Sequence, residues 1–184
     1  MTNKSLKNLI LSAMFLALGF ILPMLTGQIP VIGKILLPMH IPVFLCGLIC
    51  GWKHGLAIGG TLSILRSLLF SVPVMYPTAI AVAFEMAVYG SVTGILYSRS
   101  KAQTVRALYC AMLVAMVLGR AVRCVAEIAL LGFAGNAFVW KTFVTGVLLN
   151  AIPGILLQLI LIPAIMLALK RTSPSPRTKR QRSA

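Results

Sequence analysis

Acidic residues are nearly absent from this sequence of 184 residues, which holds two glutamates, Glu85 and Glu127, and no aspartate. Metal-dependent membrane enzymes that act on lipid or isoprenoid substrates need clustered carboxylates to hold Mg²⁺. Two isolated glutamates do not supply such a cluster, which argues against a lipid-modifying enzyme. A Walker A motif is also absent, so any coupling to ATP must come from partner proteins.

Charged residues of either sign are scarce, at 10% of the chain, while 59% of the residues are hydrophobic and the mean hydropathy is +0.98. A soluble domain has about 25% charged residues, so we expect an integral membrane protein of one compact domain. The net charge of +15 would suggest a nucleic-acid partner in a soluble chain. Here the basic residues lie mainly in loops and tail without a basic–aromatic stripe, and we expect no nucleic-acid binding.

Cysteine is also sparse, and the four cysteines lie inside apolar segments. Cys46 and Cys50 share one helical face, but no third or fourth soft ligand lies close in sequence. We therefore interpret them as small buried residues and expect no metal site. The chain also lacks an internal repeat, and its first apolar run is too long for a cleavable signal peptide and has no clear cleavage site.

Apolar runs separated by Pro, Gly or basic turns predict an all-α bundle of six transmembrane helices over residues 1–170. The predicted helices are 9–25, 39–52, 56–72, 78–97, 107–131 and 138–169. Between them we expect a loop or lid at 26–38, a tight polar turn at 52–55, a break at 73–77, a basic turn at 98–106 and a flexible connection at 132–137. The last helix exceeds one span, so it must tilt, kink at Pro153 or project from the bilayer. Residues 171–184 form a basic tail that we expect to be disordered in the cytoplasm.

The distribution of basic residues predicts the orientation. Six helices place both termini on one side, and twelve Lys and Arg residues fall on that side, whereas Lys34 and Lys141 fall on the other. Because cytoplasmic loops carry the excess of Lys and Arg, we expect both termini in the cytoplasm. We expect a multi-pass protein of the cell membrane, of bacterial origin.

Three charged residues lie within the predicted helix 107–131. Arg120, Arg123 and Glu127 are spaced i, i+3 and i+7 and so share one helical face. A charge near the bilayer centre costs at least ~2.5 kcal/mol, so it normally faces a bundle interior or a wet cavity. Two interpretations stay open: an Arg123–Glu127 pair that holds helices together, or a binding site for a polar solute.

Other polar residues reach similar depths. The helical rise places Glu85 ~12 Å and Asn150 ~18 Å from the outer ends of their helices, and Arg66 ~15 Å from the cytoplasmic end of its helix. These groups gather at and above the midplane, which favours a pocket that opens to the outside. A purely structural network has no particular reason to favour one half of the membrane.

Three intramembrane arginines against two glutamates leave one surplus positive charge. We therefore expect a small polar ligand with an anionic or strongly hydrogen-bonding group, held by Arg120 or Arg123. Glu85 would be an arginine partner or a hydrogen-bond acceptor for the ligand. His40 follows the first outer loop and completes the candidate set, although a lone histidine there is more often an interfacial or hydrogen-bonded residue.

The first helix carries a separate signal. Ala13 and Ala17 form a small-xxx-small face, which lets another helix approach closely in lipid.

Over about residues 5–170 the chain resembles the substrate-binding (S) component of energy-coupling factor (ECF) vitamin transporters. The resemblance rests on six helices, the Pro/Gly-broken first outer loop, the Ala13–Ala17 pattern, and the segments 36–51, 77–90 and 148–158. It implies vitamin uptake without enzyme activity and without a cofactor on this chain. It implies that the alanine face docks on a transmembrane coupling subunit, and that two cytoplasmic ATPases use ATP to drive transport.

The resemblance further implies that the S component topples in the membrane to carry the vitamin inward. The implied pocket lies in the outer half, between the first outer loop and helices three to six. Pantothenate, a folate, a pyridoxine-like compound or another carboxylate or amide solute would fit. The alternatives are a self-associating exporter or channel, with Glu85 or Glu127 on a proton path, and a lipid-modifying enzyme. Purification separates these, because an S component co-purifies with its coupling subunit and ATPases.

Overall fold

The computed structural model describes residues 3–25, 38–100, 104–133 and 152–172, and it confirms the predicted all-α fold. Four segments are long and apolar enough to cross a membrane: 5–24, 75–99, 105–132 and 152–169. The described elements are α1 (Asn3–Leu25), α3 (His40–Cys50), α4 (Trp52–Phe70), the π-helical turn η1 (Met75–Ala79), α5 (Ile80–Arg99), α6 (Val105–Phe133) and α8 (Ile152–Thr172).

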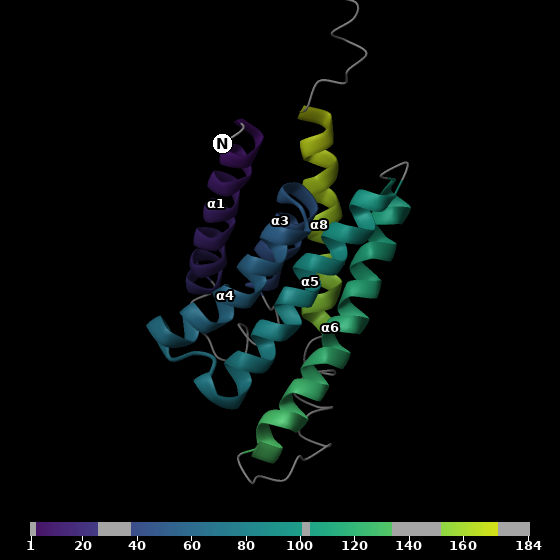
Figure 1. The fold of residues 1–184 in the computed structure, drawn as a ribbon. Coiled ribbons are helices and arrows are strands. Elements are labelled where there is room, and N and C mark those ends of the chain that lie inside the picture. The colour runs from purple at the N-terminus through teal and green to yellow at the C-terminus, as the bar shows by residue number, and fades with distance from the viewer. Residues whose placement is uncertain (1–2, 26–37, 101–103, 134–151, 173–184) are drawn as a thin grey trace, which may run out of the picture.

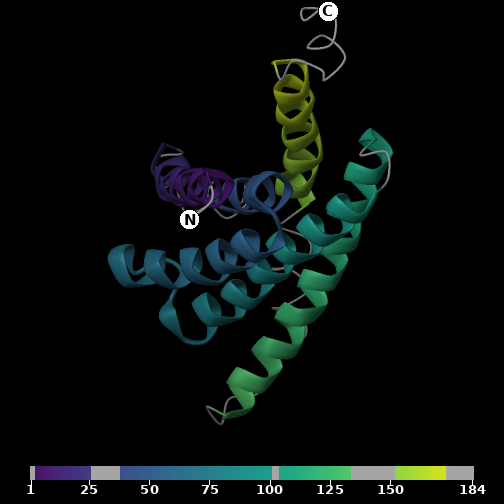
Figure 2. The same ribbon diagram turned by 45° about the horizontal axis from the view of Figure 1, so that its top comes forward.

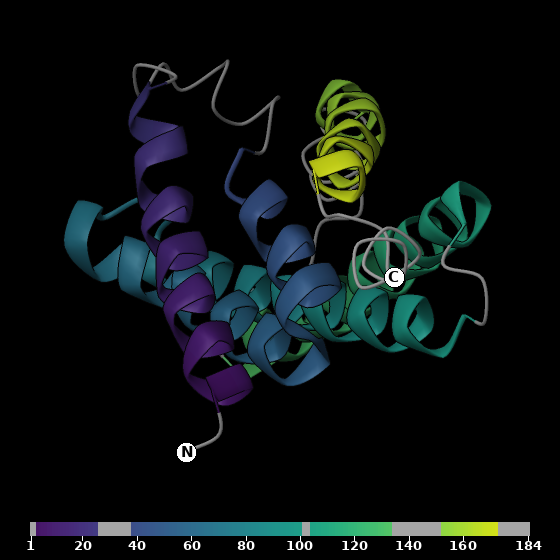
Figure 3. The same ribbon diagram turned by 90° about the horizontal axis from the view of Figure 1, so that it is seen from above.

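The helices α4, α5 and α6 pack side by side, and α1, α3 and α8 lie across them (Figures 1 and 2). Seen from above, α3 lies between α1 and α8, and α1 lies at the edge of the bundle (Figure 3). The most extensive packing joins α5 to α4 and to α6. Helix α5 is therefore the centre of the fold.

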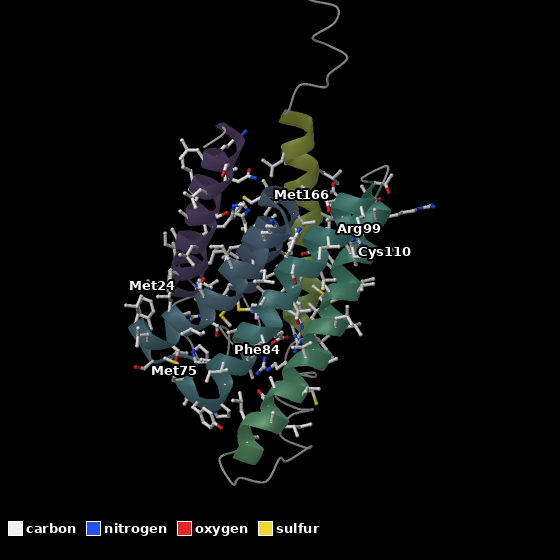
Figure 4. All side chains as sticks on the ribbon, viewed as in Figure 1. Met24, Met75, Phe84, Arg99, Cys110 and Met166 are labelled. Carbon is white, nitrogen blue, oxygen red and sulfur yellow. The ribbon has the colours of Figure 1, made fainter. Side chains whose placement is uncertain are left out.

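Both described chain ends lie at one end of the bundle, where α1 begins and α8 ends (Figure 1). The junction of α3 and α4 lies at this end too, because Asn8 Nδ2 donates to Cys50 O at 3.3 Å. Arg99 is also at this end, whereas Met24 and Met75 are at the other (Figure 4). We call these the terminal end and the far end. The arrangement agrees with an even number of membrane crossings.

The predicted polar turn at 52–55 is wrong, because α4 begins at Trp52. Gly51 alone separates α3 from α4, with φ 96°, a conformation that glycine adopts without steric cost. Gly55 N then donates to Gly51 O at 3.0 Å and starts the helix. The earlier start places Arg66 about 21 Å along α4, one turn before its end. Arg66 therefore lies toward the far end of the bundle.

The predicted interruption at 73–77 separates α4 from α5. Two serine side chains of α4 donate hydrogen bonds to backbone oxygens of the segment between these helices. Ser67 Oγ donates to Pro73 O at 2.6 Å, and Ser63 Oγ donates to Ala79 O at 3.0 Å. In the last helix Pro153 occupies the first turn of α8, where its missing N–H breaks no helical bond. Residues 26–37, 101–103, 134–151 and 173–184 lie outside the described residues, and with them most of the predicted loop at 26–38, connection at 132–137 and tail at 171–184, and the first part of the predicted helix 138–169.

Glycines bring the backbones of α3, α4 and α5 into direct contact. A Cβ atom on Gly90 would lie 2.2 Å from Gly55 O, and one on Gly47 would lie 2.2 Å from Gly90 O. A Cβ atom on Gly59 would lie 2.3 Å from Met86 O. Real Cβ atoms do not approach oxygen so closely, so these positions require glycine. These contacts, which we call the glycine seam, fix the position of α5 along its axis relative to α3 and α4.

Candidate functional site

The site begins with two residues one turn apart on α5. Glu85 and Tyr89 share a helical face because they are four residues apart. The Tyr89 hydroxyl donates to Glu85 Oε1 at 2.6 Å, and the Glu85 side chain is 0% exposed. A carboxylate so deep in a membrane protein needs a positive partner.

Helix α6 supplies that charge. Arg120 Nε lies 3.0 Å from Glu85 Oε1, and Arg123 Nη1 lies 3.0 Å from Glu85 Oε2. Each carboxylate oxygen therefore meets its own guanidinium. Arg120 Nε also lies 3.1 Å from the Tyr89 hydroxyl, so the tyrosine connects the two helices a second time.

A second glutamate completes the group. Arg123 Nε donates to Glu127 Oε1 at 3.2 Å, within one turn of α6. We call Glu85, Tyr89, Arg120, Arg123 and Glu127 the Glu85 network. Its two positive and two negative charges cancel, which lowers the cost of holding them in a medium of low dielectric constant.

The members of the network differ in accessibility. Arg120, Arg123 and Glu127 keep 12–14% of their side-chain surface exposed, whereas Glu85 is fully enclosed. Helix α5 thus contributes the fully buried carboxylate, and α6 contributes side chains that keep part of their surface exposed. Phe84, the residue before Glu85 in α5, lies toward the far end and away from Arg99 (Figure 4), so the network lies in that part of α5.

Aromatic packing holds Tyr89 in place. Its ring stacks on Phe44 with centroids 4.9 Å apart, and the His40 ring lies 5.5 Å away on the same side of the bundle. Gly119 allows this approach from α6, since a Cβ atom there would lie 2.3 Å from the Tyr89 ring. The sequence interpretation missed Tyr89, although its i, i+4 spacing from Glu85 was a usable signal.

The structure thus brings together four of the predicted residues, Glu85, Arg120, Arg123 and Glu127, and sets His40 beside them. The predicted Arg123–Glu127 pair is present. Arg66 lies apart, half-buried, with its Nη1 atom 3.4 Å from Met39 Sδ. Asn150 lies outside the described residues.

Two further features lie away from the network. A recess of about 10 Å³ at the terminal end, lined by residues that include Tyr97, Leu108 and Met166, has room for one water molecule at most. Cys46 and Cys50 are buried at the contact with α1, where Cys46 Sγ lies 3.7 Å from Ser12 Oγ. Among the described residues no group of three or more His, Cys, Asp or Glu side chains could hold a metal ion.

The predicted docking face also lies in the described part of the chain. Ala13 and Ala17 are exposed on α1, while Ser12 and Gly19 of the same helix face the bundle. A Cβ atom on Gly19 would lie 2.6 Å from the Leu62 side chain. Helix α1 therefore turns Ser12 and Gly19 inward to α3 and α4 and leaves the alanine face open.

Comparison with known families gives a match over residues 7–166 to the model described as "ECF transporter, substrate-specific component". Comparisons with curated proteins and with solved structures found no match.

Proposed function

The chain belongs to the family of substrate-specific components of ECF transporters, and we propose that it captures a small water-soluble vitamin or related nutrient with high affinity. Members of this family are substrate-binding subunits of a transporter and not enzymes, and they work with a coupling module. The exporter and lipid-enzyme alternatives therefore do not hold.

The observation that carries the proposal is the Glu85 network. Arg120, Arg123 and Glu127 keep part of their side-chain surface exposed within an apolar bundle, and their guanidinium and carboxylate groups have the donors and acceptors to bind one solute. The two ion pairs with Glu85 hold both guanidinium groups in place. A positioned donor loses less entropy on binding than a mobile one. His40 and Asn150 complete the proposed set of contacts.

The orientation is part of the proposal. Lys7, Lys53, Arg99 and Arg106 lie on the helices that meet at the terminal end, and the network lies toward the far end. If the terminal end faces the cytoplasm, as the excess of basic residues favours, the network faces the outside. A nutrient would then enter from the side on which it is scarce.

Energy would come from partner subunits. We propose that the open face of Ala13 and Ala17 docks on a transmembrane coupling subunit, which two cytoplasmic ATPases drive. Small residues let two helices approach closely in lipid, and α1 at the edge of the bundle is placed for such a contact (Figure 3).

Mass spectrometry of small molecules retained by the purified chain tests the binding role. We expect one vitamin-sized solute to be retained by the wild-type protein. Arg120→Ala should weaken its binding by roughly 10- to 100-fold, the effect of removing a charged hydrogen-bond donor. Arg106→Ala, which removes an exposed arginine from the first turn of the same helix, is the matched control and should retain the solute.

Thermal denaturation of both variants shows whether they remain folded. If folded Arg120→Ala protein retained as much solute as the wild type, the network would not be the binding site.

A further inference from the structure

The arginines and glutamates inside the bundle do not pair one to one. The chain contains two acidic side chains in all, and the Glu85 network holds both of them with two arginines. Segments outside the described residues therefore have no side-chain carboxylate to offer. Of the three intramembrane arginines, Arg66 is therefore the one that no glutamate neutralises, and Arg120 and Arg123 are paired.

The surroundings of Arg66 do not neutralise it. Its side chain is half-buried on α4, and its contact among the described residues is with the Met39 thioether at 3.4 Å. A thioether sulfur is a weak acceptor without charge. A guanidinium group inside a membrane protein is costly unless an anion meets it.

The pairing of α4 with α5 gives the depth of Arg66 relative to the network. Ser63 of α4 is level with Ala79, to which it donates a hydrogen bond. Arg66 lies beyond Ser63 toward the far end, and Ala79 precedes Glu85 by six residues. Arg66 is therefore about 13 Å nearer the far end than Glu85 is, because six residues of α5 and three of α4 separate their levels.

Arg66 and the network nevertheless both contact the start of α3. Met39 directly precedes His40, and the His40 ring lies against Tyr89 of the network. The first turn of α3 thus contacts Arg66 on one side and the network on the other. A ligand that met both Arg66 and the network would lie along the start of α3.

We propose that Arg66 is the anion-binding residue of this chain and holds a carboxylate or phosphate group. Guanidinium suits this role because its planar donors match the oxygens of these groups in pairs. Resting on the proposed function, the inference names the substrate class: a nutrient with one anionic group and a hydrogen-bonding part nearer the Glu85 network. The phosphate of a lipid headgroup has the same chemistry and is the second source of the anion.

The test compares acids with their uncharged counterparts in nanodiscs that contain the full chain. The probes are pantothenate with pantothenol, nicotinate with nicotinamide, and biotin with biotin amide, measured by native mass spectrometry. We expect the wild type to bind the acid of one pair at least about tenfold more tightly than its counterpart. Arg66→Gln should abolish that preference, and Arg66→Lys should retain part of it.

The second arm measures lipid. Nanodiscs of phosphatidylcholine with phosphatidylglycerol show whether Arg66→Gln reduces the number of anionic lipids that stay bound to the released protein. Lys53→Gln removes one positive charge from the other end of α4 and should change neither the solute preference nor the retained lipid.

The outcomes separate the two proposals. Loss of the acid preference in Arg66→Gln identifies the substrate as the source of the anion, and loss of retained anionic lipid identifies a headgroup. If Arg66→Gln changes neither quantity, whether or not the wild type binds a probe, the role of Arg66 is overturned. A solute that the wild type and Arg66→Gln retain equally would leave the proposed function standing and exclude its extension to Arg66.

Discussion

Glu85 carries a negative charge into the interior of the bundle, and two arginines from the neighbouring helix meet it there at 3.0 Å each. Both of its oxygens are engaged, and Tyr89 donates a further hydrogen bond. Glu127 differs, because it meets one arginine within its own helix and keeps 14% of its surface exposed. The two acids of the chain therefore contribute unequally to stability.

Glu85→Gln should lower the free energy of unfolding by about 3–5 kcal/mol, because it leaves two guanidinium groups without their shared buried partner. Glu127→Gln should cost less, because Arg123 keeps its contact with Glu85 when the pair within α6 is lost. Thermal denaturation in detergent measures both variants. Equal melting temperatures for the two would show that Glu85 does not anchor α5 to α6.

Residue spacing predicted part of this site. Arg120, Arg123 and Glu127 were identified from their common helical face, and the depth of Glu85 indicated the same level of the membrane. Tyr89 was missed although it lies four residues from Glu85, because that spacing alone does not show which groups the tyrosine meets on other helices. Its role follows from contacts with α3 and α6 that are distant in sequence.

The glycine seam sets the packing at the scale of helices. Gly55 and Gly59 of α4 oppose Gly90 and Met86 of α5 with backbone against backbone. Helix α4 also contains Gly60, where an added Cβ atom would meet only the Ala87 side chain, at 4.0 Å. Two adjacent glycines in one helix thus have different packing requirements.

Gly59→Ala should destabilise the protein by about 1–3 kcal/mol, because its Cβ atom would force α4 away from Met86 O. Gly60→Ala should be neutral or stabilising by up to about 1 kcal/mol, since alanine favours a helix more than glycine does. Melting temperatures and the yield of folded protein compare the pair. A Gly59→Ala protein as stable as Gly60→Ala would mean that the seam tolerates a side chain.

For the described residues, the helical type and the approximate positions of the helices were predictable from apolar runs, but helix boundaries and contacts were less so. The residues Trp, Lys, His and Gly at 52–55 were read as a tight polar turn, yet the chain reverses at Gly51 alone, which has a positive φ. Glycines at four-residue intervals were visible in the sequence. Which helices they join depends on the three-dimensional arrangement.

The whole molecule acts with partners, and its edge helix α1 is where we expect them to dock. Inward-facing residues of α1 pack on α3 and α4, while Ala13 and Ala17 remain open. The predicted role of this face was read from the sequence, and the structure adds that the bundle leaves the face uncovered.

Ala13→Trp should abolish co-purification with the coupling subunit and the two ATPases, because an indole ring prevents close helix approach. Binding of the retained solute should stay within about twofold of the wild type, since Ala13 is exposed on α1 and is not part of the network. Ala57→Trp, at an exposed position on α4, is the matched control and should assemble normally. Assembly retained in Ala13→Trp would contradict the docking role.

The direct backbone contacts at the glycine seam also bear on motion. Where one main chain rests on another, there are no rotamers to change and little room for sliding, so α3, α4 and α5 should move as a rigid body. Helices α1 and α8 meet this body through side chains, which can repack. We therefore expect any hinge used during the transport cycle to lie at the borders of α1 and α8, with the core carried along unchanged.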